Sequence, residues 1–150
     1  MRELSQGDLI RAEAQLYCAK LPSVFYLYCK ETKGKTKYKY LVILSSDGLS
    51  AYYLMINSKQ YFADGCEIPV TPDELPCLSR NSFIDCRELI RISREELIFR
   101  IAENIENYNR GIVPDALKLR ISAAAEQART LNKIEKRIIV DAMKSDVQDE

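Results

Sequence analysis

The fold is decided by the stretch Lys37-Tyr38-Lys39-Tyr40-Leu41-Val42-Ile43-Leu44, with the Ser46-Asp47-Gly48 turn and the run Ala51-Tyr52-Tyr53-Leu54-Met55-Ile56-Asn57-Ser58 after it. Two runs rich in β-branched and aromatic residues on either side of an Asp-Gly pair are typical of a β-hairpin. The run from Leu41 to Leu44 is apolar without a break, which predicts a strand covered on both faces. We therefore expect this hairpin to lie at the centre of a small, curved β-sheet.

Shorter segments on both sides of the hairpin are expected to add further strands. Their alternating apolar residues and flanking turn signals place them at residues 8–14, 24–29, 66–70, 82–86 and 89–92. Pro69 puts its strand on an edge of the sheet, because proline cannot donate to a strand ladder. Many short strands with frequent turns indicate a small barrel or sandwich.

The composition changes at Ser93, where Ser93-Arg94-Glu95-Glu96 matches a helix capping box. Apolar residues then recur at helical spacing in three segments, which begin at Ser93, at Pro114 and at Asn132. We predict an α+β protein with an antiparallel β-barrel over residues 1–92. A C-terminal set of three helices over 93–144 packs on the barrel, and 145–150 forms a flexible tail.

The overall composition excludes several classes of function. Of the 150 residues, 22 are Lys or Arg and 22 are Asp or Glu, and this zero net charge argues against a dedicated, salt-driven DNA-binding protein. The chain has no histidine, which removes Ser-His and Cys-His nucleophile pairs and histidine general bases. No apolar run approaches the roughly 20 residues of a membrane span, and the N-terminus lacks a signal-peptide core. We expect a cytoplasmic protein with no membrane partner.

Five lysines lie within ten residues before and at the start of the hairpin: Lys30, Lys33, Lys35, Lys37 and Lys39. With Tyr38 and Tyr40 interleaved, this loop could hold a phosphate backbone and stack bases. The alternative is a solubilising loop, since charge runs are usually solvated surfaces.

A polar cluster, Asn57-Ser58-Lys59-Gln60, directly follows the second strand of the hairpin. Such side chains often line a site at the mouth of a sheet. The alternative is an ordinary strand end with its turn residues.

The cysteines and one carboxylate complete the set of candidate residues. The spacing of Cys66, Cys77 and Cys86 is too long and irregular for a zinc ribbon, so we expect no metal site and no cofactor. All five cysteines are expected to be buried or half-buried thiols. Asp85 stands in an apolar strand and, if it points inward, needs an ion-pair partner such as Arg11 or Arg80.

Three motifs together resemble the MazF/PemK-type toxin family, over about residues 7–92. They are Gly7-Asp8-Leu9-Ile10, Lys39-Tyr40-Leu41-Val42-Ile43-Leu44-Ser45 and Met55-Ile56-Asn57-Ser58. The resemblance implies a small SH3-like barrel and, for many members, a ribosome-independent and metal-independent endoribonuclease of a toxin–antitoxin or phage-defence system. It also implies RNA, an antitoxin and a second copy of the chain as partners.

The resemblance places Lys39 at the family's catalytic arginine and Ser58 at its hydroxyl. The Arg-Pro pair of the family is replaced by Lys39-Tyr40, and Asn57 stands where the family has threonine. Cleavage would use the RNA's own 2′-hydroxyl, and Glu31 and Asp47 are candidate bases by proximity in the sequence alone.

The expected RNA-binding residues, from the lysine loop and the polar cluster, are Lys33, Lys35, Lys37, Tyr38 and Lys59. One alternative is a non-catalytic barrel module that binds RNA or a protein through the lysine loop. Another is an interaction protein whose helices bind a neighbour, with the Ala124-Ala125-Ala128 stripe as the site of close helix approach.

Overall fold

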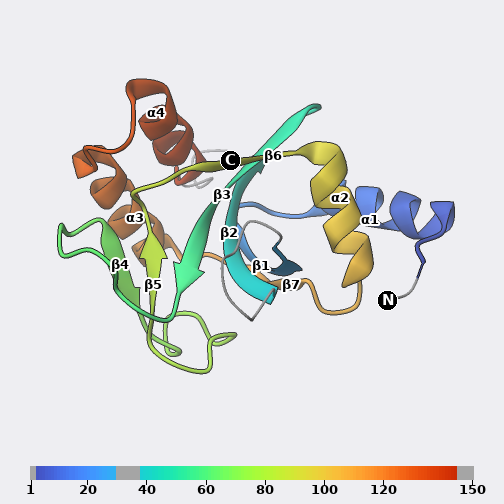
Figure 1. Ribbon diagram of the computed structural model, residues 1–150, viewed down its shortest axis with the longest axis horizontal. Helices are drawn as coiled ribbons and strands as arrows, with labels where there is room; N and C mark the ends of the chain where they lie inside the picture. Colours follow the sequence, from blue (N-terminus) through green and yellow to red (C-terminus); the bar gives the residue numbers. More distant parts are fainter. Residues whose placement is uncertain (1–2, 30–37, 145–150) are drawn as a thin grey trace.

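The computed structural model describes residues 3–29 and 38–144. The described chain is an α+β protein, as predicted, and Figure 1 shows its helices on two sides of a sheet. Its elements in chain order are α1 Gln6–Cys18, β1 Ser23–Tyr28, β2 Tyr38–Ser46, β3 Ser50–Asn57, β4 Glu67–Val70, β5 Ser82–Asp85, β6 Ile90–Ser93, α2 Arg94–Glu103, β7 Asn109–Ile112, α3 Asp115–Gln127 and α4 Lys133–Ala142.

The predicted hairpin is confirmed as β2 and β3, which pair antiparallel with Leu41 opposite Met55 and Val42 opposite Leu54. The Asp47 carboxylate closes the turn, because its Oδ1 accepts the backbone N–H groups of Leu49 and Ser50. Local turn chemistry thus closes the hairpin, and a register shift between Ile43 and Ser45 separates the pairs near the turn from those in the centre of the strands.

The hairpin is the middle of a curled antiparallel sheet with the strand order β4-β5-β3-β2-β1-β7. Strand β3 keeps β2 on one side, but on its other side it pairs first with β6 and then with β5. This change of partner bends the sheet into a half-barrel. The terminal strands β4 and β7 do not pair with each other in the described chain, so the predicted barrel is not closed there.

The two faces of the sheet carry separate cores, and period-two alternation assigns each side chain to its face. Phe25, Leu41 and Ile43 pack against α1 and α2, whereas Val42 and Leu54 pack on the side of α3 and α4 (Figure 1). Leu41 through Leu44 are at most 2% exposed, which confirms that this strand is covered on both faces.

The strand predicted at residues 8–14 is wrong, because this segment belongs to helix α1. Ser5 and Asp8 form a capping box in which each side chain accepts the other's backbone N–H, at 3.1 and 2.8 Å. Ala12 and Leu16 lie on the inner face of the helix and are buried under the sheet. Four helices are therefore present in the described chain, and one of them precedes the sheet.

The helix predicted from Ser93 stops early, although apolar residues continue at helical spacing through Ile105 and Tyr108. It ends at Glu103, and the Asn104 side chain donates a 2.8 Å hydrogen bond to the Tyr26 carbonyl. The chain then enters β7, which pairs with β1 inside the segment assigned to the helical extension. None of the described helices has the length and apolar character needed to cross a membrane.

Candidate nucleic-acid interface

Four tyrosines project from neighbouring strands on the sheet face that α3 and α4 cover elsewhere. Tyr26 lies opposite Tyr40, and Tyr28 lies opposite Tyr38, in the β1–β2 ladder. All four occupy the same alternation phase as the buried Val42 and are themselves half-buried. The four rings therefore lie on the same face of the sheet as the core beneath α3 and α4, and part of each ring is accessible.

The rings contact one another across the two strands. Tyr26 stacks on Tyr38, with ring centroids 5.4 Å apart and planes at 27°, and it lies 4.7 Å from the Tyr40 ring. The Arg110 guanidinium from β7 lies over the Tyr26 ring, 5.0 Å from its centroid. These contacts hold the rings as a platform of fixed orientation.

A cavity of about 240 Å³ opens beside this platform. We call it the tyrosine pocket; it lies where β2 begins and β3 ends, with the segment before β5 as its far wall. Its lining residues are Tyr26, Tyr38, Lys39, Tyr40, Ile56, Asn57, Ser58, Leu78, Ser79, Arg80 and Ser82.

The tyrosine pocket is positively charged. Lys39 and Arg80 are its only ionised lining groups among the described residues, and neither forms an ion pair with a described carboxylate. Burial is the main cause that raises the pKa of Tyr38 and of Tyr40, so both phenols stay protonated at neutral pH. The pocket lining thus includes two cationic residues, phenol and hydroxyl donors, and aromatic faces. Lys39 alternates with Tyr38 and Tyr40 and lies opposite Leu27, so its side chain leaves β2 on the other face of the sheet, whereas Arg80 belongs to the far wall of the pocket.

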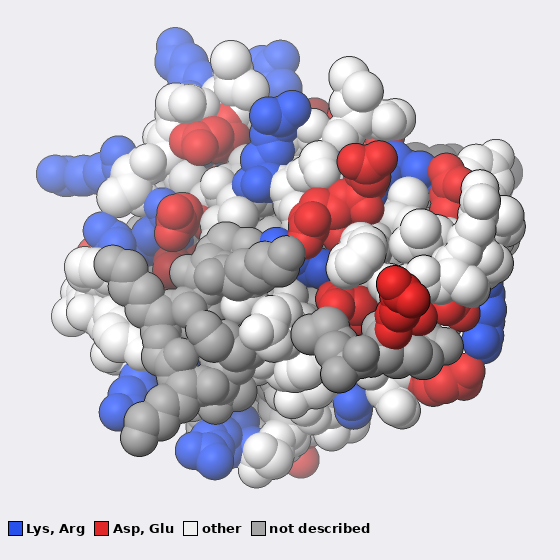
Figure 2. Space-filling view, turned by 45° about the vertical axis from the view of Figure 1, so that its right-hand side comes forward, with Lys and Arg blue, Asp and Glu red and all other residues white. Residues whose placement is uncertain are grey.

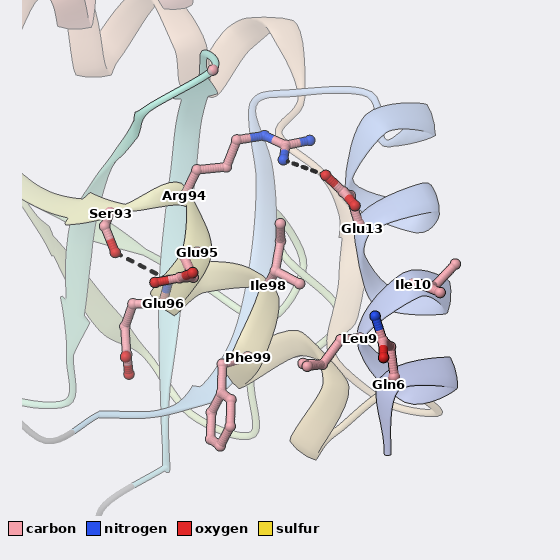
Figure 3. A pocket seen from close by; sticks show the side chains of 11 residues that line it. Gln6, Leu9, Ile10, Glu13, Ser93, Arg94, Glu95, Glu96, Ile98 and Phe99 are labelled. Atoms are coloured by element: carbon pink, nitrogen blue, oxygen red, sulfur yellow. Dashed lines mark hydrogen bonds and ion pairs between the residues drawn. The ribbon is translucent and has the colours of Figure 1, made fainter. Parts of the chain in front are cut away.

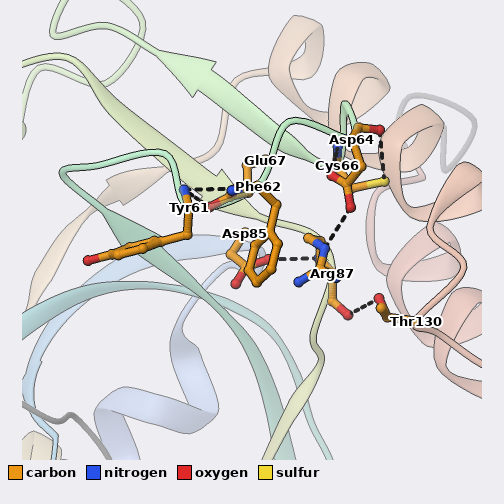
Figure 4. A network of polar contacts seen from close by, with 8 residues as sticks. All are labelled: Tyr61, Phe62, Asp64, Cys66, Glu67, Asp85, Arg87 and Thr130. Carbon is orange, nitrogen blue, oxygen red and sulfur yellow. Dashed lines mark hydrogen bonds and ion pairs between the residues drawn. The ribbon is translucent and has the colours of Figure 1, made fainter.

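The chain that leaves the pocket after Ser58 is anchored by a buried carboxylate (Figure 4). Glu67 is 2% exposed and accepts the backbone N–H groups of Tyr61 and Phe62. Arg87 lies 3.6 Å from the centroid of the Phe62 ring and forms a 2.7 Å ion pair with Asp64. These contacts hold the part of the β3–β4 loop from Tyr61 to Asp64 against β4 and the segment after β5.

The structure brings Lys39, Ser58 and Tyr38 together in the tyrosine pocket, although they come from two strands. Lys59 is exposed and is not one of the lining residues. Three further predicted RNA-binding residues, Lys33, Lys35 and Lys37, lie outside the described residues, as does Glu31.

Asp47 does not share this site, so its proximity in the sequence was misleading. It lies in the turn at the opposite end of the β2–β3 hairpin, where its carboxylate serves the turn.

The ion pair predicted for Asp85 is also wrong. Asp85 accepts the backbone N–H of Arg87 at 2.8 Å and lies opposite Glu67 in the β4–β5 ladder. Arg11 instead pairs with Glu106, and Arg80 lines the tyrosine pocket. Partial burial is the main cause that raises the pKa of Asp85, and the Glu67 carboxylate adds to it.

The thiols are more varied than predicted, because Cys18 is exposed while Cys29, Cys66 and Cys86 are buried and Cys77 is intermediate. Burial is the main cause that raises the pKa of the thiols of Cys66, Cys77 and Cys86, so they are poor nucleophiles. In the described part of the chain, no three Cys, Asp or Glu side chains gather in an arrangement that could hold a metal ion.

Sequence reasoning missed Tyr26 and Arg80 as members of the site. Period-two spacing could have found Tyr26, because Tyr26 and Tyr28 alternate as Tyr38 and Tyr40 do on the paired strand. Arg80 lies outside any helix or strand, so no periodicity indicates where its side chain lies.

Chemically, the arrangement can bind an anion next to a planar group. Arg80 can contact phosphate oxygens directly, Lys39 can do so when its long stem extends past the start of β2, and the tyrosine rings can stack on a base. No protein-family model matches this chain, and a search of curated proteins also finds no match.

Proposed function

We propose that this protein binds single-stranded RNA, with a base stacked on the tyrosine platform and the adjoining phosphate held by Lys39 and Arg80. The observation that carries the proposal is the tyrosine pocket itself, where two cations without ion-pair partners among the described residues lie beside aromatic rings. Cations together with stacking rings are the usual means of binding single strands.

The size of the pocket favours part of an extended ligand over a whole small molecule. Its volume of about 240 Å³ is below the roughly 300–1,000 Å³ of pockets that enclose drug-sized ligands. A single base or phosphate group of a longer chain fits this scale. Its position at strand ends, open to solvent on one side, leaves room for the flanking nucleotides.

The plain structural alternative is that the tyrosines only extend the core. Tyr40 does pack against the buried cluster on its face of the sheet, so part of its role is structural. That role does not account for Lys39 and Arg80, which gain no carboxylate partner among the described residues by lying there. Both cations would be equally well solvated elsewhere on the surface.

A second candidate function is metal-independent RNA cleavage in a MazF/PemK-like, SH3-like framework. It is favoured by the shared position of Lys39 and Ser58, the two residues that the resemblance assigns to the scissile phosphate. The 2′-hydroxyl would give its proton to water as its oxygen attacks phosphorus, and the P–O5′ bond would break as the 5′-oxygen takes a proton from water. Lys39 would stabilise the charge of the phosphorane, and Ser58 would position a phosphate oxygen. No described lining residue is a carboxylate, so binding is better supported than cleavage.

Fluorescence anisotropy with a labelled mixed-sequence RNA of ten nucleotides tests binding, and gel analysis of the same samples in EDTA tests cleavage. Losing one base stack costs about 1–3 kcal/mol in alanine substitutions, so we expect Tyr38→Leu to weaken binding about tenfold. Tyr17→Leu, on the exposed face of α1, is the control. Equal affinities for the two variants would refute the binding proposal.

Cleavage has its own criterion in the same samples. Cleavage that persists in EDTA and disappears in both Lys39→Ala and Ser58→Ala supports catalysis at this pocket. Intact RNA with wild-type protein, or cleavage that both variants retain, rules out the second candidate and leaves RNA binding as the proposed function.

A further inference from the structure

A second hollow lies between helices α1 and α2 (Figure 3). These helices cover the face of the sheet opposite to the one that carries the four tyrosines. Its volume is about 750 Å³, and Leu9 and Ile98 lie in the space between the two helices. An adjoining hollow of about 450 Å³ extends past Tyr17 and shares Gly48 and Arg94 with the first. We call the two together the α1–α2 groove.

Ion pairs and buried apolar residues between α1 and α2 fix the shape of the groove. Arg94 at the start of α2 forms a 3.0 Å ion pair with Glu13 of α1, and Arg11 of α1 forms a 3.2 Å ion pair with Glu106 beyond α2. Leu97 and Ala12 are completely buried beneath the groove. The shape is therefore part of the fold, as a preformed binding surface requires.

Large apolar side chains are exposed along the groove. Ile10 and Phe99, which line the first hollow, are 61% and 39% exposed, and Tyr17, which lines the second, is 84% exposed. Ile10 and Tyr17 are seven residues apart on α1 and share a face of the helix. Exposed apolar groups that gather around a hollow can mark an interaction site, whereas isolated ones need no explanation.

Negative charges outnumber positive charges around the groove. The described residues 3–18 and 93–107, which include both helices, contain seven carboxylates and three arginines. Each arginine already pairs with a carboxylate, because Arg100 of α2 pairs with Glu96 in addition to the two ion pairs between the helices. Figure 2 brings this side forward and shows the acidic side chains gathered on the right half of the visible face.

We propose that the α1–α2 groove binds a basic, amphipathic helix of a partner protein. The apolar face of such a helix would cover Leu9, Ile98 and Phe99, and its Lys or Arg side chains would meet Glu95 at the rim. Helix α1 is 13 residues long, about 20 Å, which suits a partner helix of three to four turns. Complementary charge would steer the encounter and fix the partner's orientation.

The test uses three labelled helical peptides of 14 residues. The first has Leu on one face and Lys on the other, the second replaces every Lys with Glu, and the third scrambles the first so that no face is apolar. We expect the Leu/Lys helix to bind at least tenfold more tightly than the other two and to weaken as NaCl rises. Equal binding of all three peptides, or no binding, would overturn the proposal.

Matched variants localise the binding. We expect Phe99→Ser and Glu95→Lys each to weaken the Leu/Lys peptide at least fivefold. Leu119→Ser and Glu126→Lys, exposed changes of the same kinds on α3, should leave its affinity unchanged. Equal effects of both sets would overturn the proposal. Sedimentation of the protein alone tests another occupant, because self-association that Phe99→Ser abolishes would assign the groove to a second copy and also contradict the proposal.

Discussion

Removing the side chains of Lys39 and Arg80, one at a time and together, tests whether RNA phosphates contact the tyrosine pocket. These are the only charged groups among its described lining residues, so the pocket offers at most two phosphate contacts there. Each phosphate contact to a single strand contributes about 0.7 to the slope of log affinity against log salt concentration. We therefore expect each single variant to lower the slope by about 0.7 and the double variant to lower it by about 1.4.

The assay is anisotropy with the same labelled RNA at a series of NaCl concentrations between 50 and 200 mM. The affinity at 50 mM NaCl divided by the affinity at 200 mM NaCl should fall by roughly threefold for each lost contact. Anisotropy resolves a change of this size. Arg129→Ala, an exposed arginine that follows α3, is the matched control and should keep the wild-type slope. Unchanged slopes in Lys39→Ala and Arg80→Ala, or an equal fall in Arg129→Ala, would refute the placement of the phosphates.

Three further predictions concern the described scaffold. Ser5→Ala removes the cap of α1 and should lower the free energy of unfolding by about 1 kcal/mol in urea titrations. Burial raises the pKa of Asp85 above its ordinary 3.8, so ionisation of this carboxyl costs stability in the folded protein at higher pH. Asp85→Asn should therefore stabilise the protein at pH 7 but not below pH 3.8. The exposed Asp73→Asn is the control, and equal effects of both variants would contradict this. Native protein should show one fast thiol with Ellman's reagent, which Cys18→Ser removes.

The central hairpin could be predicted because its signals are local and agree with one another. The Asp47-Gly48 turn, the alternating residues on both sides and the unbroken run from Leu41 to Leu44 all indicate paired strands covered on both faces. Burial of that run against four helices on two sides bears out the reasoning.

The strand predicted at residues 8–14 is wrong because a Gly-Asp pair, here Gly7-Asp8, is a typical turn signal in front of a strand. The pair lies inside the first turn of a helix, and Asp8 is the partner of Ser5 in a capping box. Leu9, Ala12 and Leu16 have the spacing of a helix face. The alternation of apolar and charged residues from Ile10 to Ala14 favours a strand over the same stretch. Because this segment was predicted to be a strand, the groove between α1 and α2 could not be predicted from the sequence.

The candidate site could be predicted only as far as the hairpin carries it. Lys39 and Ser58 meet because antiparallel pairing puts the start of β2 beside the end of β3. Arg80 comes from an irregular segment, and β7, which supplies Arg110, is short and exposed throughout. Neither has a periodic pattern, so their positions depend on tertiary packing that no local signal encodes.

Crosslinking RNA to the protein tests the central claim most directly, because it reports where the bases lie. The probe is a ten-nucleotide RNA that carries 4-thiouridine, irradiated in complex with wild-type protein and digested for mass spectrometry. We predict crosslinks to Tyr26, Tyr38 or Tyr40, and their loss when excess unlabelled RNA competes. Crosslinks confined to α3 and α4, or none above the level of a denatured control, would contradict RNA binding at the tyrosine pocket.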